Sequence, residues 1–212
     1  MTVRDTTGHP DAARPTSRPT SRPRIEGARE AEILQAALAL LREVGYDRLT
    51  MDAVAAAAHA SKASLYRRWG SKAQLVADAL NRADAGFGSP APDTGTLRGD
   101  LLAAACGAGG LLDQVPVELM AALITALQTH PDLAAACQES FLRPRLEASR
   151  ALFERARDRG EVRADLDLDL VLDVLPGIVL HRVLLRGDRP TPQLISRVVD
   201  DVVLPTVRPA TP

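Results

Sequence analysis

The sequence predicts an all-α fold, in which a small N-terminal unit of short helices is followed by a larger helical body. Apolar residues recur at helical spacing in segment after segment, as in the stripe of Leu194, Val198 and Val202. Prolines and glycines stand where helices begin or end, for example Pro131 and Gly160. A chain of 212 residues with 46% hydrophobic side chains is also long enough to bury a substantial core.

The first 24 residues are expected to be disordered. Proline recurs at Pro15, Pro19 and Pro23, and the run Thr-Ser-Arg-Pro occurs twice, over 16–19 and 20–23. Proline at every fourth position prevents a helix, and almost no apolar side chain is available for a core. Residues 1–24 are therefore expected to form a basic arm ahead of the first helix.

The first helix is expected over residues 26–43, with Gly45 as its stop. Its apolar side chains share one face: Ile33, Leu34, Ala37, Leu38 and Leu41. Such a face needs partner helices, and the segment that follows supplies them.

Residues 49–80 are typical of three short helices separated by tight turns. Thr50 is expected to cap a helix over 51–58 and Ser61 a helix over 62–69, because a hydroxyl accepts from the free N–H groups of a first turn. The run Ser-Lys-Ala-Gln from residue 71 predicts a capping box for the third helix, which continues as an apolar stripe.

The helix over 62–69 has two chemically different faces. At about 100° per residue, Leu65 and Trp69 point toward a core. The opposite face and its flanks carry small, hydroxyl-bearing and cationic side chains: Ala63, Ser64 and Arg67, with Lys62, Tyr66 and Arg68 beside them. No acid occurs between Asp52 and Asp78. Such a face is suited to approach a base-pair edge closely and to bind phosphates.

A short helix, a tight turn and a helix of this kind form a helix-turn-helix. With Ile33-Leu34-x-Ala36-Ala37 and Val44-Gly45-Tyr46-Asp47 upstream, the segment resembles the DNA-binding domain of the tetracycline-repressor (TetR) family of transcription regulators. The matching pieces lie in order within residues 26–86: Leu49-Thr50-Met51, Val54-Ala55, Ser61-Lys62-Ala63-Ser64-Leu65-Tyr66, Arg67-Arg68-Trp69 and Ser71-Lys72. His59 departs from the family pattern, which usually has Gly in this turn. If the turn requires a left-handed residue, His tolerates that conformation at some cost.

The resemblance implies roles for individual residues. Thr50 and Lys72 correspond to phosphate contacts, and Ala63 to the position closest to the base edges. The recognition helix is implied to contact DNA through Ser61, Lys62, Ser64, Tyr66 and Arg68, and the sequence places Arg67 on the same outward face.

The charge distribution agrees with contact to phosphate in the N-terminal part. Residues 1–82 hold 13 Lys and Arg against 9 Asp and Glu, whereas residues 83–212 hold 13 against 18. Two interpretations of the arm stay open. It adds phosphate or minor-groove contacts through Arg14, Arg18, Arg22 and Arg24, or it is a solvated tail.

The prolines and glycines of residues 86–95 predict a junction, after which residues 95–208 form a helical domain. The resemblance implies that this domain serves effector binding and dimerisation. Its helices are expected over 96–112, 116–129, 131–159, 167–186 and 191–207. Asp93 or Thr94 is expected to cap the first of them. Pro144 should kink or split the third helix, and Pro176-Gly177 the fourth.

The last two helices predict a homodimer. The segment 168–185 is apolar almost all round and must be covered on every side, for which a partner subunit is the natural cover. Residues 97–207 are also similar to a C-terminal domain type common in actinobacterial members of the family. The similar pieces are Asp93-Thr94-Gly95, Leu97-Arg98-x-Asp100-Leu101, Pro144-Arg145, Arg159-Gly160-Glu161-Val162-Arg163 and Asp165-x-Asp167. Two recognition helices about 34 Å apart would read an inverted repeat in double-stranded DNA.

The resemblance further implies that a small molecule entering the helical body releases the protein from DNA. Polar or aromatic residues in otherwise apolar helices are the candidate pocket residues: Cys106, Thr125, Gln128, Cys137, Phe141 and His181. A pocket lined by Leu, Val and Ala suits a compact lipophilic effector. Plainer interpretations exist as well, with the two cysteines as small core residues and His181 in the dimer interface.

Two alternatives differ in class. One is a helix-turn-helix regulator without an effector, constitutive or architectural, which a filled core would favour. The other is an all-helical enzyme, which is disfavoured because the sequence offers no Ser/His/Asp or Cys/His set, no metal-ligand spacing and no phosphate loop. No catalytic residue, metal ligand or cofactor is therefore expected. Without a signal-peptide pattern or a long charge-free apolar run, no membrane association and a cytoplasmic location are expected.

Overall fold

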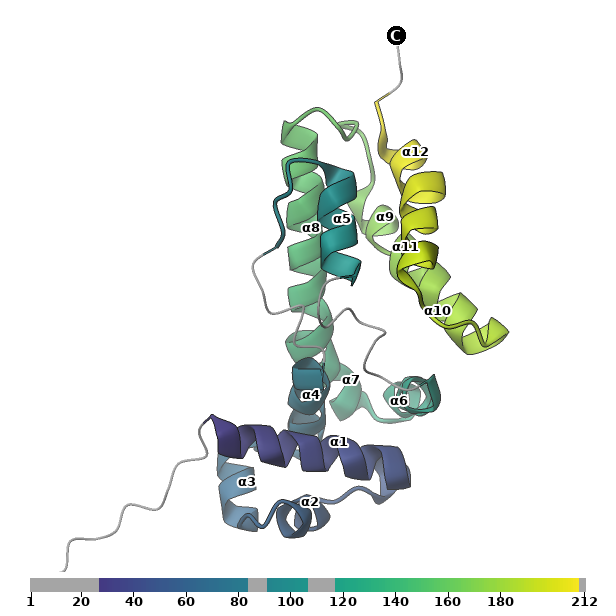
Figure 1. The fold of residues 1–212 in the computed structure, drawn as a ribbon. Coiled ribbons are helices and arrows are strands. Elements are labelled where there is room, and N and C mark those ends of the chain that lie inside the picture. The colour runs from purple at the N-terminus through teal and green to yellow at the C-terminus, as the bar shows by residue number, and fades with distance from the viewer. Residues whose placement is uncertain (1–26, 84–90, 107–116, 210–212) are drawn as a thin grey trace, which may run out of the picture.

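The computed structural model describes residues 27–83, 91–106 and 117–209, and every regular element in these ranges is a helix (Figure 1). The predicted all-α class is therefore confirmed. The elements are α1 (Ala28–Arg48), α2 (Met51–Ala57), α3 (Lys62–Trp69), α4 (Lys72–Ala83), α5 (Leu97–Cys106), α6 (Val117–Thr129), α7 (Pro131–Cys137), η2 (Gln138–Leu142), α8 (Arg143–Asp158), α9 (Leu168–Leu172), α10 (Val174–Arg186), α11 (Pro192–Val198), η3 (Val199–Val203) and α12 (Leu204–Val207). The predicted basic arm over 1–24 lies outside the described residues. None of the described helices combines the length and the apolar character needed to cross a membrane.

The first four helices form where the local signals predict them. Thr50 Oγ1 accepts from the Ala53 amide at 3.1 Å, which confirms the cap of α2. Gly45, with φ of 75°, interrupts α1, and one further helical turn follows it. Ser71 Oγ accepts from the Gln74 amide at 3.1 Å and caps α4. The predicted capping box is only half formed, because the side chain of Gln74 bonds elsewhere.

Two hydrophobic clusters hold the described helices together. The first joins α1–α4 to residues of α6 and α7, among them Leu119, Leu123 and Leu133. The second joins α5, α8, α9, α11, η3 and α12. In Figure 1 the helices of the first cluster lie in the lower part of the molecule and those of the second in the upper part. The helices that follow the predicted junction are thus divided between both clusters.

The third predicted helix is split as expected, and a π turn marks the split. The amide of Arg143 reaches back five residues to the carbonyl of Gln138, so η2 holds one residue more than an α turn. Pro144 follows directly and offers no N–H to the ladder. The same arrangement recurs at the C-terminus, where η3 precedes Pro205.

The fourth predicted helix is also split, but not at the predicted Pro176-Gly177. The break lies at Asp173, between α9 and α10. Pro176 is the third residue of α10, a position at which the missing N–H costs no helical hydrogen bond. The amide of Gly177 already bonds to the carbonyl of Asp173 at 2.9 Å.

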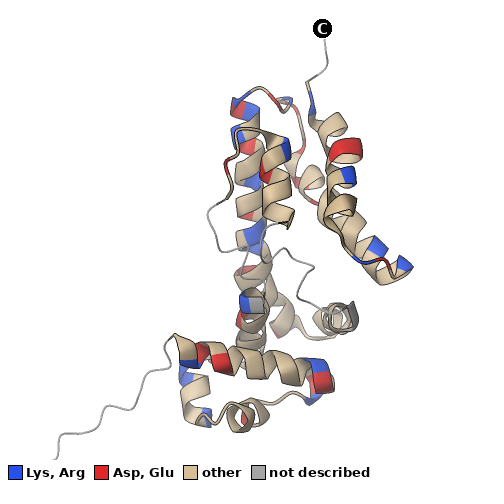
Figure 2. Cartoon of the chain, in the orientation of Figure 1, with Lys and Arg blue, Asp and Glu red and all other residues tan. Residues whose placement is uncertain are grey.

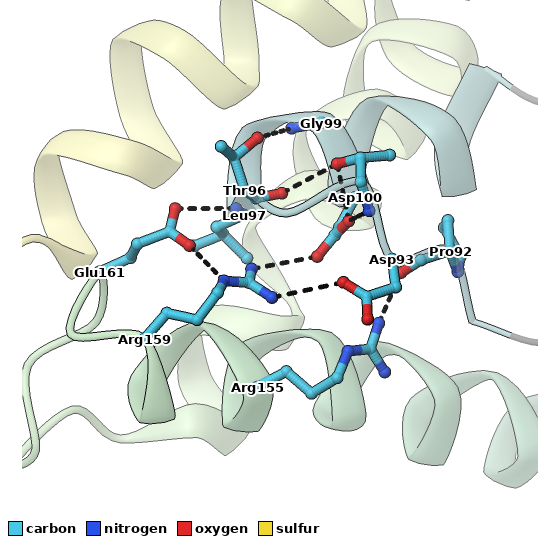
Figure 3. A network of polar contacts seen from close by, with 10 residues as sticks. Pro92, Asp93, Thr96, Leu97, Gly99, Asp100, Arg155, Arg159 and Glu161 are labelled. Atoms are coloured by element: carbon cyan, nitrogen blue, oxygen red, sulfur yellow. Dashed lines mark hydrogen bonds and ion pairs between the residues drawn. The ribbon is translucent and has the colours of Figure 1, made fainter.

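A buried polar network fixes the start of α5 to the end of α8 (Figure 3). Asp100 is fully buried and accepts from the amide and the hydroxyl of Thr94 at 2.6 and 2.8 Å, and from Arg159 at 3.1 Å. Glu161 accepts from Arg159 at 2.7 Å and from the Leu97 amide at 2.8 Å.

The cap of α5 differs from the prediction. Thr96 accepts from the Gly99 amide at 3.1 Å, whereas Thr94 bonds to Asp100 and Asp93 lies 3.7 Å from Arg159. A Cβ at Gly99 would come within 2.1 Å of the Thr94 hydroxyl oxygen, so this close approach requires glycine.

Candidate nucleic-acid interface

The turn between α2 and α3 is held in a left-handed conformation. His59 has φ of 49° and is the one non-glycine residue with positive φ in the described part of the chain. Its carbonyl and that of Ala58 accept from Arg29 of α1 at 2.7 and 2.6 Å. Arg29 therefore ties the C-terminal end of α2 to α1. Sequence reasoning missed this contact, because 30 positions separate the partners.

The two faces of α3 are arranged as the sequence predicts. Leu65 and Trp69 are 0% and 4% exposed and pack in the first hydrophobic cluster. The opposite side and its flanks face solvent: Lys62, Ala63, Tyr66, Arg67 and Arg68 are exposed and Ser64 is half-buried. Small, hydroxyl-bearing and cationic groups are thus presented on one outward surface.

Hydroxyl groups at the start of α3 bond to one another. Ser61 Oγ accepts from the Ser64 amide at 3.1 Å, which confirms the predicted cap, and donates to Ser64 Oγ at 2.8 Å. Arg67 also donates to Ser64 Oγ, at 3.3 Å. Thr50, at the start of α2, is exposed as well. These hydroxyl groups form hydrogen bonds within their own helix or its first turn, and a phosphate oxygen can replace those partners.

Two cations of α3 bind acids outside the helix. Lys62 Nζ lies 2.9 Å from the Asp52 carboxylate, and hydrogen bonding to Asp52, together with its charge, raises the pKa of Lys62. Arg68 donates to Glu30 of α1 at 2.7 Å. Figure 2 shows the basic residues of α3 beside acidic positions of α1. Both acids lie outside the acid-free run, so the run alone did not indicate these pairs.

Lys72 differs from the other predicted phosphate contacts because it is half-buried. Its Nζ donates to the Tyr46 carbonyl at 2.9 Å and lies 4.0 Å from the centroid of the Tyr46 ring. Burial, as the main cause, raises the pKa of Tyr46 to about 12, so the ring stays neutral beneath the ammonium group. Lys72 therefore joins α4 to the end of α1.

The recognition helix is anchored to α4 by polar contacts as well as by packing. Trp69 Nε1 donates to one carboxylate oxygen of Asp78 at 3.1 Å, and Gln74 Nε2 donates to the other at 2.9 Å. The position of α3 is thereby linked to the side chains of α4.

The helical body contains a cavity of about 180 Å³ among α5, η2, α8, α9, α10 and Ile195 of α11. Its lining is almost entirely Leu, Val, Ala and Phe side chains, with Ser149 and Arg145 as polar groups. Phe141 is the one predicted pocket residue that lines it. Arg145 and Ser149 were missed as lining residues, although Pro144-Arg145 had been noted as a family piece.

The other five predicted pocket residues lie outside this lining. Thr125, Gln128 and His181 are exposed, and Thr125 bonds to the Ala121 carbonyl of its own helix. Cys106 is exposed at the end of α5. Cys137 is buried in the first cluster, and burial raises the pKa of its thiol to about 11. Across the described ranges no cluster of three or more His, Cys, Asp or Glu side chains is placed to hold a metal ion.

A helix-turn-helix with an outward cationic surface, carried on a larger helical body with an apolar cavity, is typical of DNA-binding regulators. Residues 33–79 match the family described as bacterial regulatory proteins of the tetR family, and residues 91–202 match the tetracyclin repressor-like C-terminal domain. The chain therefore belongs to the tetR family, and it is a DNA-binding transcriptional regulator.

Individual relatives support the same assignment. The DNA-binding transcriptional repressor TetR of Mycobacteroides abscessus is 40% identical over 181 residues, covering 85% of this chain and 95% of the relative. An HTH-type transcriptional regulator of Mycobacterium tuberculosis, Rv1556, is 38% identical over 203 residues, covering 94% and 96%. The crystal structure of the TetR family transcription regulator SCO0332 superposes with a TM-score of 0.66 at 31% identity, covering 86% of this chain and 100% of that one.

Proposed function

We propose that the protein binds an inverted-repeat operator as a homodimer, most simply as a repressor, and is released when a small lipophilic effector enters the cavity. The outward surface of α3 carries the proposal. The DNA contacts proposed for the protein lie on α3 and at the starts of α2, α3 and α4: Thr50, Ser61, Lys62, Ala63, Ser64, Tyr66, Arg67, Arg68 and Lys72. A recognition helix reads too few bases by itself, so two copies one DNA turn apart are needed for a specific site.

Exposed apolar side chains on α9 and α10 support the dimer. Leu170 and Leu185 are 68% and 77% exposed, and of the residues of α10 only Val179 and Val183 are buried. Figure 2 shows α10 without charge until its C-terminal turns. Surfaces of this kind are typical of contacts between protein chains.

The cavity favours an effector-responsive regulator over one without an effector. Its volume resembles that of an engineered apolar cavity of about 150 Å³ that binds benzene. The apolar lining favours an uncharged compound with few polar groups, for which Ser149 offers one hydroxyl.

A matched pair of arginine variants tests the DNA-binding surface. After operator fragments have been selected from genomic DNA, Arg67→Ala is expected to lower affinity about 5- to 150-fold, because the variant loses a base or phosphate contact. Arg197→Ala removes an equally exposed arginine from α11 and should leave affinity unchanged. Equal effects of the two variants would contradict the assignment of the surface. Arg67 is a better choice than Lys72, whose removal also breaks the contact to Tyr46.

A further inference from the structure

The π turn η2 lies between the cavity and α4, the helix to which the recognition helix α3 is anchored. We propose that Asn81 and Gln74 are positioning residues that pass the state of the cavity, through η2, to Trp69 of α3. This inference rests on the proposed function, because it assigns the path by which an effector in that cavity acts on DNA binding.

The first link is a carbonyl that Pro144 leaves without its helical donor. In an α-helix the amide of residue 144 would bond to the carbonyl of Ser140, but proline has no N–H. Asn81 Nδ2 of α4 donates to this carbonyl at 2.9 Å instead. The irregular backbone of η2 is thus stabilised by a side chain of α4.

The second link reaches the cavity. Arg145, 8% exposed, lines the cavity and donates to Asn81 Oδ1 at 2.8 Å and to the Phe141 carbonyl at 2.7 Å. Its guanidinium carbon lies 3.7 Å from the centroid of the Phe141 ring. Phe141 lines the cavity and also packs against the first hydrophobic cluster. A ligand that displaces Phe141 therefore also displaces the partners of Asn81.

The third link reaches the recognition helix. Gln74 Nε2 donates to Ser140 Oγ at 2.8 Å and to Asp78 at 2.9 Å, and Asp78 accepts from Trp69 Nε1 at 3.1 Å. Each step from the cavity to α3 is a hydrogen bond between named groups. The path is short because η2 contacts α4 directly.

A π turn is a suitable element for this role. It differs from an α turn by one residue, so a change between the two states is a discrete shift in register. An effector that binds one arrangement of η2, the π turn or the α turn, more tightly than the other shifts their populations. The free energy of that shift cannot exceed the difference between the two binding free energies.

Trp69 is the only tryptophan of the chain, so its fluorescence reports on the end of the path. Toluene serves as the probe, because it is apolar, of suitable size and is not excited at 295 nm. Calorimetry measures toluene binding to the full chain, and Trp69 emission is recorded in the same titration, without DNA. In the wild type we expect binding to be accompanied by a change in the Trp69 emission.

Three variants separate transmission from binding. Asn81→Asp retains an acceptor for Arg145 but loses the donor to the Ser140 carbonyl, and Gln74→Ala removes the bond to Ser140 Oγ. Both are expected to bind toluene within about twofold of the wild type and to lose the Trp69 response. Gln138→Ala removes an exposed amide from η2 itself and should keep the response. Thermal unfolding confirms that each variant is folded.

An unchanged Trp69 response in both Asn81→Asp and Gln74→Ala would overturn the proposal. If toluene does not bind the wild type, the variant Ser149→Leu replaces the ligand in the experiment, because the leucine side chain fills the cavity from α8. Its Trp69 emission should then differ from the wild type, and Gln74→Ala should abolish that difference. No difference would overturn the proposal. Failure of the proposed function would be seen in a different experiment, in which the protein does not bind an operator or no ligand releases it from the operator. The fluorescence comparison contains no DNA, so the two failures are distinguishable.

Discussion

His59 is the residue at which the chain departs from the family pattern and also the one with a left-handed backbone. Its side chain is exposed, and the turn is held through backbone groups, including the carbonyl that accepts from Arg29. An L-residue in this region of φ and ψ is strained, whereas glycine is not.

His59→Gly is therefore expected to raise the free energy of unfolding by about 0.5–1 kcal/mol. Denaturant unfolding followed by circular dichroism measures the change. Ala121→Gly, in the exposed middle of α6, serves as the control and should lower stability by a similar amount, about 0.5–1 kcal/mol. A loss of stability in both variants would show that the turn is not strained.

Glu30 is the acid closest to the recognition helix among the contacts described, through its ion pair with Arg68. We expect Glu30→Gln to raise operator affinity about twofold, because Arg68 is released for phosphate and a repelling charge is removed. Glu43→Gln, an exposed acid at the other end of α1, should have a smaller effect. Fluorescence anisotropy at several salt concentrations measures both, and weaker binding by Glu30→Gln would contradict this role.

At this scale the sequence indicated local geometry well and distant partners poorly. Periodicity placed Leu65 and Trp69 on the buried face, because residues four apart on a helix share a side. It could not show that Arg29 reaches the carbonyl of His59, or that Arg145 lines the cavity. Those contacts depend on how separate helices pack.

Among the elements, α5 and α8 show how short sequence motifs that resemble the family come into contact in the fold. The pieces around Asp93 and Arg159 are separated by more than sixty positions, yet they meet in the network of Figure 3. Proline positions likewise predicted breaks in the third and fourth helices of the body. They could not specify the π turn, whose Ser140 carbonyl is taken up by a side chain of α4, or the place of the second break, which lies three residues before Pro176.

The network also predicts how stability changes with pH. Burial tends to raise the pKa of Asp100, but the hydrogen bonds from Thr94 and the contact with Arg159 outweigh it and hold the pKa below the usual 3.8. The stabilisation is therefore complete above the unfolded-state pKa and is lost as the pH falls through the folded-state pKa.

Asp100→Asn is expected to cost about 1–3 kcal/mol at pH 7, because buried donors lose a charged acceptor. Its stability deficit relative to the wild type should shrink as the pH is lowered below about 4. Urea unfolding between pH 7 and pH 3 tests this expectation. A deficit that does not change with pH would show that the charge of Asp100 contributes nothing.

For the whole molecule, the exposed apolar surface of α9 and α10 leads to a prediction on assembly. Leu185→Glu is expected to shift the protein to monomers at micromolar concentration and to weaken operator binding more than tenfold, because charge is placed in the proposed interface. Sedimentation velocity and operator titration measure the two effects. Ala103→Glu adds the same charge to an exposed position of α5 and should remain dimeric. A wild type that sediments as a monomer while binding its operator would reject the dimer.

The division of the core into two hydrophobic clusters also determines where the chain can be cut or fused. Leu133 and Cys137 of α7 are 0% and 2% exposed in the same cluster as α1–α4, so the DNA-reading part shares its interior with later segments of the chain. A fragment cut after α4 would leave part of that interior facing water. Hybrid regulators that exchange operator preference between relatives should therefore carry α6 and α7 with the reader, and place the fusion point after them.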